Sequence, residues 1–204
     1  HDPGIPLGPW RSVGHSQNAF ITESFIDELA NLAGQDPYQF RRRLLREHQD
    51  YLKVLDLVAE KSNWGNAGQG LHQGVAIHKS FGTIVSQVVD LELVNDKPKL
   101  KRVTCAVDCG TAVNPDQVAA QIESSVVFGL TAALKGEINI EGGAVKESNF
   151  HDYQMLRMDK TPPIDVHIVD SNLPPAGVGE PGTPSIAPAL GNALFAATGK
   201  RQRS

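Results

Sequence analysis

The sequence predicts a mixed α+β fold, and two features of the chain point to it. Apolar residues recur at helical spacing in some segments, and β-branched and aliphatic residues alternate in others, without a regular βαβ rhythm. A length of 204 residues allows one large domain or two small ones. We expect residues 1–64, a loop with helices, and residues 65–204, a region of strands and helices, to form one interdependent unit.

The chain opens with an irregular segment and a first helix. Pro and Gly recur up to residue 14 without periodicity, which favours a loop. Apolar positions at helical spacing then predict a helix over residues 19–32, which Gly34 ends.

Two shorter helices follow. Asp36 is a favoured N-cap and Pro37 suits a first helical turn, so a second helix begins there. We expect the arginines at 41–43 to form a mainly solvated face of this helix. Apolar spacing predicts a third helix over residues 49–62.

Residues 74–108 predict paired strands. β-branched and aliphatic residues dominate from Val75 to Leu93, and Asn95 to Pro98 has the composition of a turn, after which a strand resumes. The chain has two cysteines, Cys105 and Cys109, in this region. Their spacing offers no metal site, and we expect buried thiols.

The last part of the chain alternates helices and strands. Asn114 and Pro115 suit the start of a long helix, which we expect to be largely buried. A hairpin is predicted over residues 137–148 and a strand over residues 164–169. An apolar helix is predicted over residues 185–198.

Composition excludes several classes of protein. Hydrophobic residues make up 40% of the chain and charged residues 21%, which is typical of globular proteins and argues against disorder. A net charge of −4 with scattered Lys and Arg argues against nucleic-acid binding. No segment reaches the roughly 18 consecutive apolar residues of a membrane span, and the amino terminus lacks the order of a signal peptide. We therefore expect a soluble chain, and both cytoplasm and periplasm stay open as its compartment.

One carboxylate stands in an unusual loop, Pro174 to Pro184. Glu180 is flanked by Gly and Pro residues, which let backbone approach a ligand closely and limit the directions of the carboxylate. A helix begins just after this loop, and its N-terminus favours anions nearby. A catalytic carboxylate and a surface turn whose Glu caps the helix both agree with these residues.

Three other segments offer weaker candidates. The turn from Asp108 to Asn114 joins a strand to a helix and presents backbone N–H groups, with Gln121 on that helix, although an ordinary capped turn is equally consistent. Arg11 lies among small residues and is suited to an anionic or carbonyl group. The segment Asn149 to Tyr153 has one His beside one Asp but no third metal ligand, so we expect no protein-held metal.

Four stretches, taken in order, resemble one family. They are Trp10–Phe20, Ala106–Gly110 with Val113–Val118, Ser148–Tyr153 and Gly177–Gly182. Together they resemble the C-terminal, molybdopterin-binding region of the large subunit of molybdenum hydroxylases, the xanthine oxidase and aldehyde oxidoreductase family. The isoquinoline 1-oxidoreductase beta-subunit type is the most similar. The resemblance covers essentially the whole chain and implies long helices packed on a mixed sheet.

The resemblance implies a molybdenum-dependent oxidoreductase that hydroxylates an aldehyde or an N-heteroaromatic compound with oxygen from water. Glu180 matches the active-site glutamate of the family, the general base that takes a proton from the attacking hydroxyl group. The positions that match cofactor-binding residues are Arg11, Ser12, Val13, Gly14, Gln121 and Gly179. Val13 replaces a substrate-facing aromatic residue of relatives, which implies a wider pocket.

The resemblance also implies a cofactor and partners. The cofactor is molybdopterin carrying molybdenum, expected in its cytosine dinucleotide form, and iron–sulfur clusters lie on a small 2Fe-2S electron-transfer subunit. Large subunits of this family are several times longer, so we expect this chain to be a part that is inactive without the N-terminal remainder. Ser124 and Ser125 stand where relatives have two glycines, which puts close backbone approach there in doubt.

A non-catalytic alternative stays open on the residues alone. In it the chain is a binding or scaffold module without metal, and Glu180 only caps a helix. The residues specify neither the substrate, the electron acceptor nor the oligomeric state.

Overall fold

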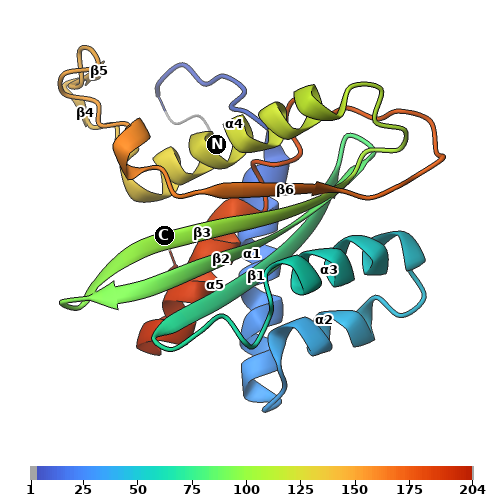
Figure 1. Cartoon of the computed structure of the whole chain (residues 1–204). Helices are drawn as coiled ribbons and strands as arrows, with labels where there is room; N and C mark the ends of the chain where they lie inside the picture. Colours follow the sequence, from blue (N-terminus) through green and yellow to red (C-terminus); the bar gives the residue numbers. More distant parts are fainter. Residues whose placement is uncertain (1–3, 204) are drawn as a thin grey trace.

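The computed structural model describes residues 4–203 and shows a four-stranded sheet between two layers of helices (Figure 1). The helices are α1 (Gly14–Leu32), α2 (Pro37–Leu44), α3 (Gln49–Lys61), α4 (Pro115–Leu134) and α5 (Ile186–Thr198), with a 3-10 turn at Met158–Lys160. The strands are β1 (Leu71–Ser80), β2 (Thr83–Val94), β3 (Lys97–Asp108), β4 (Ile140–Glu141), β5 (Ala144–Val145) and β6 (Ile164–Ile168). The predicted mixed α+β class is confirmed.

The sheet has the order β1-β2-β3-β6. The first three strands are antiparallel neighbours, and β6 runs parallel to β3. Asn95 and Asp96 form the predicted turn between β2 and β3, both with positive φ. A second tight turn, at Phe81 and Gly82, separates β1 from β2. The run of strand residues from Val75 to Leu93 did not predict this turn. The small β4-β5 hairpin, also predicted, projects beyond α4 (Figure 1).

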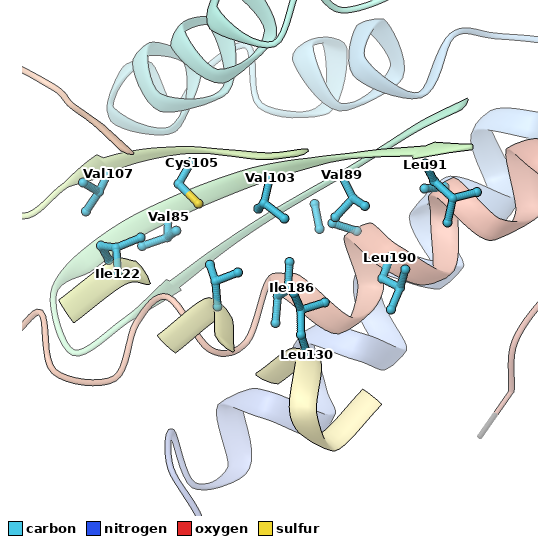
Figure 2. Close-up of a cluster of buried hydrophobic side chains, with 14 of the residues drawn as sticks. Val85, Val89, Leu91, Val103, Cys105, Val107, Ile122, Leu130, Ile186 and Leu190 are labelled. Carbon is cyan, nitrogen blue, oxygen red and sulfur yellow. The ribbon is translucent and has the colours of Figure 1, made fainter. Parts of the chain in front are cut away.

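One face of the sheet carries the larger core, beneath α4 and α5 (Figure 2). Its buried strand residues alternate along β2 and β3, as in Val85, Val89, Val103 and Val107. Figure 2 shows these side chains pointing toward those of the two helices, Ile122 and Leu130 on α4 and Ile186 and Leu190 on α5. Only one face of α4 is buried, because α4 packs that face toward β6 and α5 and leaves its other face exposed, so the expectation of a largely buried helix is wrong.

The opposite face of the sheet packs against α3. Val54, Leu55 and Val58 of α3 are fully buried against strand residues such as Val75 and Val88. Because the side chains of a strand alternate between its faces, β1 and β2 serve both cores. Helix α3 belongs to residues 1–64 and packs on the sheet of residues 65–204, so these two segments share this core.

Helices α1 and α5 contact the outer edge of β1, and each provides a hydrogen-bond partner for one backbone group of that strand. Glu23 Oε2 accepts a hydrogen bond from the N–H of Ile77 at 2.9 Å, and Asn192 of α5 donates to the carbonyl of Val75 at 3.1 Å. These contacts cover an edge strand, which would otherwise expose unpaired backbone groups. The buried face of α1 is therefore polar, whereas Phe25, at 57% exposure, faces outward.

The expectation of solvated arginines at 41–43 is wrong for Arg41. Its side chain is 1% exposed and donates to Glu23 Oε2 at 2.8 Å. Asp27 lies 3.6 Å from the same guanidinium and 2.7 Å from that of Arg201. Arg41 is buried because two carboxylates on α1 compensate its charge, and those carboxylates come from a different helix.

The other predicted helices are confirmed, with one difference. Asp36 caps α2 through a hydrogen bond from the N–H of Gln39, and Asn114 caps α4 in the same way from Gln117. Helix α1 begins at Gly14 rather than Ala19, because a turn over Trp10–Val13 leads directly into it. Within residues 4–203, no helix combines the length and apolar character that a bilayer span requires.

Candidate active site

Two loops at opposite ends of the sequence meet at one place. Ser12 donates its hydroxyl hydrogen to the carbonyl of Glu180, with the oxygens 2.6 Å apart, and its backbone N–H faces Glu180 Oε1 at 3.4 Å. Arg11 donates from Nε to the carbonyl of Gly179 at 2.9 Å, and its Nη2 donates to the same oxygen. The structure thus brings Arg11, Ser12, Gly179 and Glu180 together.

The turn before α1 has an unusual backbone. Ser12 has φ 71° and Val13 has φ 43°, both in the left-handed region that non-glycine residues rarely adopt. Such conformations cost about 1–3 kcal/mol each and persist where the surrounding structure holds them. Ser12 is fully buried, whereas Val13 is 44% exposed and presents its side chain outward beside the site.

Arg11 joins this turn to α4. Its Nη1 donates to Ser124 Oγ at 3.2 Å, and its guanidinium carbon lies 5.5 Å from the centroid of the Phe128 ring. Trp10 packs on the same ring, with centroids 4.8 Å apart. Burial lowers the pKa of Arg11, and the negative charge of Glu180 opposes this change. Ser124 therefore replaces an expected glycine with a side-chain acceptor for Arg11.

The loop that carries Glu180 is anchored to the sheet and to α4. Thr83 donates its hydroxyl to the carbonyl of Gly177 at 2.7 Å, and Gln87 donates to that of Gly182 at 2.8 Å. A Cβ on Gly182 would lie 2.7 Å from Cβ of Ser125, so only glycine allows this packing. These anchors explain why the carboxylate of Glu180 faces Ser12.

Glu180 does not cap the helix that follows it. The N-cap of α5 is Ser185, and it makes no side-chain capping bond. The carboxylate of Glu180 instead faces the Ser12 N–H. The helix-capping alternative is thereby wrong for this loop.

Gln121 lies on the exposed side of α4, beside the Glu180 loop. It lines a cavity of about 540 Å³ together with Asn114, Gln117 and Val178. The backbone at Gly179 is open, since a Cβ there would meet nothing within 4 Å. Gly14, the first residue of α1, adjoins the strained turn. The six predicted cofactor-binding positions therefore lie on the turn, at the start of α1, on the loop or on α4.

A second cavity has a volume of about 760 Å³, and Ser124 of α4 contributes to its lining. Trp10, Phe128, Phe150 and Tyr153 also contribute to its lining, and the hydroxyl of Ser124 is the group that accepts from Arg11. The segment Asn149 to Tyr153 thus belongs to an aromatic cavity. Asp152 accepts hydrogen bonds from Ser148 and Asn149, and these backbone donors hold the pKa of its carboxyl well below its usual range.

The turn that joins β3 to α4 supports the loop that carries Glu180. Cys109 accepts a hydrogen bond at its carbonyl from Ala176 N at 2.8 Å, and Thr111 N donates to Leu173 at 2.8 Å. Gly110 has φ 70°, and a Cβ there would lie 2.1 Å from the carbonyl oxygen of Pro174. This turn therefore contacts protein backbone and helps to place the loop.

The described residues offer no protein-held metal site. In residues 4–203, no group of three or more His, Cys, Asp or Glu side chains could hold an ion. Cys105 and Cys109 are buried free thiols, as predicted, and burial raises the pKa of each. The donors at the site are N–H, hydroxyl and amide groups.

Sequence patterns did not reveal every residue that builds the site. Ser124 binds Arg11, and His15 and His78 contact each other at 3.0 Å beside the strained turn. The partners in these contacts are 113 and 63 positions apart in the chain. Local patterns carry no signal for such pairs.

Comparisons with known proteins give a consistent result. Residues 26–162 match the molybdopterin cofactor-binding domain family. The chain is 36% identical over 200 residues to the isoquinoline 1-oxidoreductase beta chain of Brevundimonas diminuta, covering 95% of this chain and 26% of that protein. It is 31% identical over 217 residues to one of the nicotinate dehydrogenase subunits of Pseudomonas putida, covering 95% and 18%.

A solved structure shows the same fold over most of the chain. The aldehyde oxidoreductase of Desulfovibrio desulfuricans superimposes with a TM-score of 0.68 at 13% identity, over 95% of this chain and 40% of that one. The chain spans 26% of the length of the Brevundimonas relative and 18% of that of the Pseudomonas relative.

Proposed function

Because the chain belongs to the molybdopterin cofactor-binding domain family, we propose that its two loops form part of the active site of a molybdenum-dependent hydroxylase. The observation that carries this proposal is the contact between Ser12 and Glu180, which sets one carboxylate beside an exposed turn and an open glycine. The reaction replaces a C–H bond of an aldehyde or N-heteroaromatic compound with C–OH, takes up one water and releases two protons and two electrons.

The chemistry of the donors suits an organic cofactor. The site offers the exposed amide of Gln121 and the open backbone at Gly179, and an amide can both donate to and accept from the nitrogen and oxygen atoms of a pterin ring. The described residues provide no cluster of metal ligands, and in the proposal the cofactor brings its metal already bound. We therefore expect Arg11, Ser12, Val13, Gly14, Gln121 and Gly179 to surround molybdopterin.

The bound cofactor supplies a metal centre that accepts the two electrons and polarises the hydroxyl group that water provides. Glu180 is the general base, which takes the proton of that hydroxyl group onto a carboxylate oxygen. Ser12 orients Glu180 through its N–H and its hydroxyl. Arg11 fixes the carbonyl of Gly179, the residue before the base. The chain thus supplies a positioned base and contributes to the cofactor cradle.

The partners follow from the same proposal. The remaining cofactor contacts come from N-terminal sequence of a longer large subunit, and the electrons leave through iron–sulfur clusters on a small 2Fe-2S subunit. We expect the cytosine dinucleotide form of the cofactor. The cavity of about 760 Å³ with Trp10, Phe128 and Phe150 has the size and apolar character that small aromatic ligands require.

The test is Glu180→Gln in the assembled, molybdenum-containing enzyme, assayed with a panel of aldehydes and N-heteroaromatic compounds. Gln has nearly the same shape but takes up no proton, so we expect kcat to fall by at least about 100-fold, with molybdenum content unchanged. The matched control is Glu137→Gln, outside the site. Activity close to that of the unmodified enzyme in Glu180→Gln would refute the role of this carboxylate.

A further inference from the structure

Three rings meet beside the candidate active site. His15 Nδ1 lies 3.0 Å from His78 Nε2, so one ring nitrogen donates a hydrogen bond and the other accepts it. The ring of His15 also meets those of His78 and Phe81 edge-on, with centroids 5.2 and 5.3 Å apart. We refer to His15, His78 and Phe81 as the three-ring cluster.

The three-ring cluster connects both loops of the site. His15 follows the strained turn, and its backbone N–H donates to the carbonyl of Ser12 at 2.9 Å. Phe81 lies in the turn between β1 and β2, and a Cβ on Gly177 would lie 3.7 Å from its Cβ. The turn before α1 and the loop that carries Glu180 therefore rest on the same end of β1 and β2.

The turn before α1 requires such support. Ser12 and Val13 hold left-handed backbone angles that relax unless neighbours fix them. Arg11 and Ser12 fix one side of the turn through Gly179 and Glu180. The His15–His78 contact fixes the other side to the sheet.

We propose that His78 is a positioning residue, which acts through His15 to hold the turn in the geometry that places Ser12 on Glu180. The effect of this contact on turnover rests on the proposed function. Its effect on the geometry of the turn stands independently of that function.

The ring of His78 is neutral in this contact at neutral pH. Burial, followed by the charge of His15, lowers the pKa of His78 to about 4. The acidic residues of β2, Asp90 and Glu92, pair with residues at the opposite end of β1. Protonation of both rings would place two cations 3.0 Å apart and break the contact.

The other charges near β1 are already paired. Lys79 points to the opposite face of the strand and lies 3.4 Å from Asp50 of α3. Glu23 of α1 is bound by Arg41 at 2.8 Å. Helix α5 contributes no titratable side chain. In the part of the chain that the structure describes, His15 is the group whose charge acts on His78.

The test compares substitutions at His78 in the isotope-labelled chain, by NMR. His78→Leu removes the ring nitrogens, and His78→Gln places an amide near the position of Nε2. In His78→Leu we expect amide hydrogen exchange at Val13 and His15 to accelerate about tenfold, and in His78→Gln we expect it to return close to the original rate. His72→Leu, at the other end of β1, is the matched control and leaves these rates unchanged.

Unchanged exchange in a folded His78→Leu chain overturns the proposal, as does a His78→Gln chain that exchanges as fast as the Leu variant. Should His78→Leu fail to fold, the unmodified chain supplies the test through a pH titration. The amide shift of Val13, whose N–H donates to the carbonyl of Trp10 rather than to a carboxylate, then follows the same midpoint as the His78 ring nitrogens, and a Val13 amide that does not respond to this titration overturns the proposal. Because these readouts need no turnover, they stay separate from the Glu180→Gln assay.

Discussion

Ser12 makes the contact on which the site depends. It is fully buried and bonds to both the backbone and the carboxylate of Glu180, so a shift of this one residue moves the carboxylate that we propose as the base. Arg11 holds the neighbouring Gly179 from the same turn. In the proposed role, a carboxylate held at two points loses little freedom when substrate binds, which is how preorganised groups contribute to catalysis.

The lowered pKa of His78 predicts how the free energy of unfolding depends on pH. The unperturbed pKa of His is about 6.5, whereas the pKa of His78 in the folded chain is about 4. Between these values the unfolded chain binds a proton that the folded chain does not, so the free energy of unfolding falls as pH is lowered from 6.5 to 4 and this contribution levels off below.

Urea denaturation of the chain between pH 7 and pH 4 checks this expectation. His78→Gln lacks the titrating ring, so its stability should fall less over the same interval. If the free energy of unfolding fell equally with pH in both proteins, His78 would contribute nothing to the pH dependence of stability.

Residue identities at the site could be predicted from the sequence, but their contacts could not. Arg11 and Glu180 stand in short motifs with unusual composition, which local patterns detect. Their neighbours Ser124 and His78 lie on α4 and β1 and come into contact through the fold. The segment of His78 contains nothing that distinguishes it from an ordinary strand residue, and Ser124 stood out only as a replaced glycine, not as a partner of Arg11.

At the scale of elements, the packing of α5 against β1 supports the placement of the site. A Cβ on Gly74 of β1 would lie 2.1 Å from Ala193 N and 2.3 Å from Ala189 O. The strand and the helix thus touch through their backbones. Helix α5 begins directly after the loop that carries Glu180, so its position fixes one end of that loop.

Gly74→Ala is expected to force α5 away from β1. Backbone atoms cannot move aside as a flexible side chain can, so we expect a loss of about 3 kcal/mol in the free energy of unfolding. Gly8→Ala is the matched control, because a Cβ at Gly8 would meet nothing within 4 Å. Equal urea midpoints for both variants would contradict the close packing of α5 on β1.

The buried ion pairs tie α1 to α2. Arg41 is 1% exposed and compensates Glu23 and Asp27, which are also buried. Arg41→Met keeps most of the volume and leaves Glu23 without a cation, so we expect a loss of about 3–5 kcal/mol in the free energy of unfolding.

Arg46→Met is the control for this variant, since the Arg46 side chain is 74% exposed. It should change stability by less than about 0.5 kcal/mol. Calorimetry on both variants checks the difference, and a small effect of Arg41→Met would show that the ion pairs are dispensable.

For the whole molecule, the elements were predictable where their signals are local. Helix ends are marked by single residues: Asp36 and Asn114 cap the N-termini of α2 and α4, and Gly199, in the left-handed conformation, caps the C-terminus of α5. The turn at Phe81 and Gly82 lacks the Asn-Gly or Asp-Gly pair typical of tight hairpins, so the sequence did not reveal it. The burial of Arg41 also escaped prediction, because its partners belong to another helix.

The central claim is that this fold completes a molybdopterin site, with the turn at Arg11 and the loop at Glu180 on one side of it. The most direct measurement is molybdenum per chain, by elemental analysis of the native complex purified from its source and identified by native mass spectrometry. We expect one molybdenum for each copy of the chain, together with a larger assembly than the 22.0 kDa chain alone. A native complex that contains this chain and no molybdenum would contradict the account.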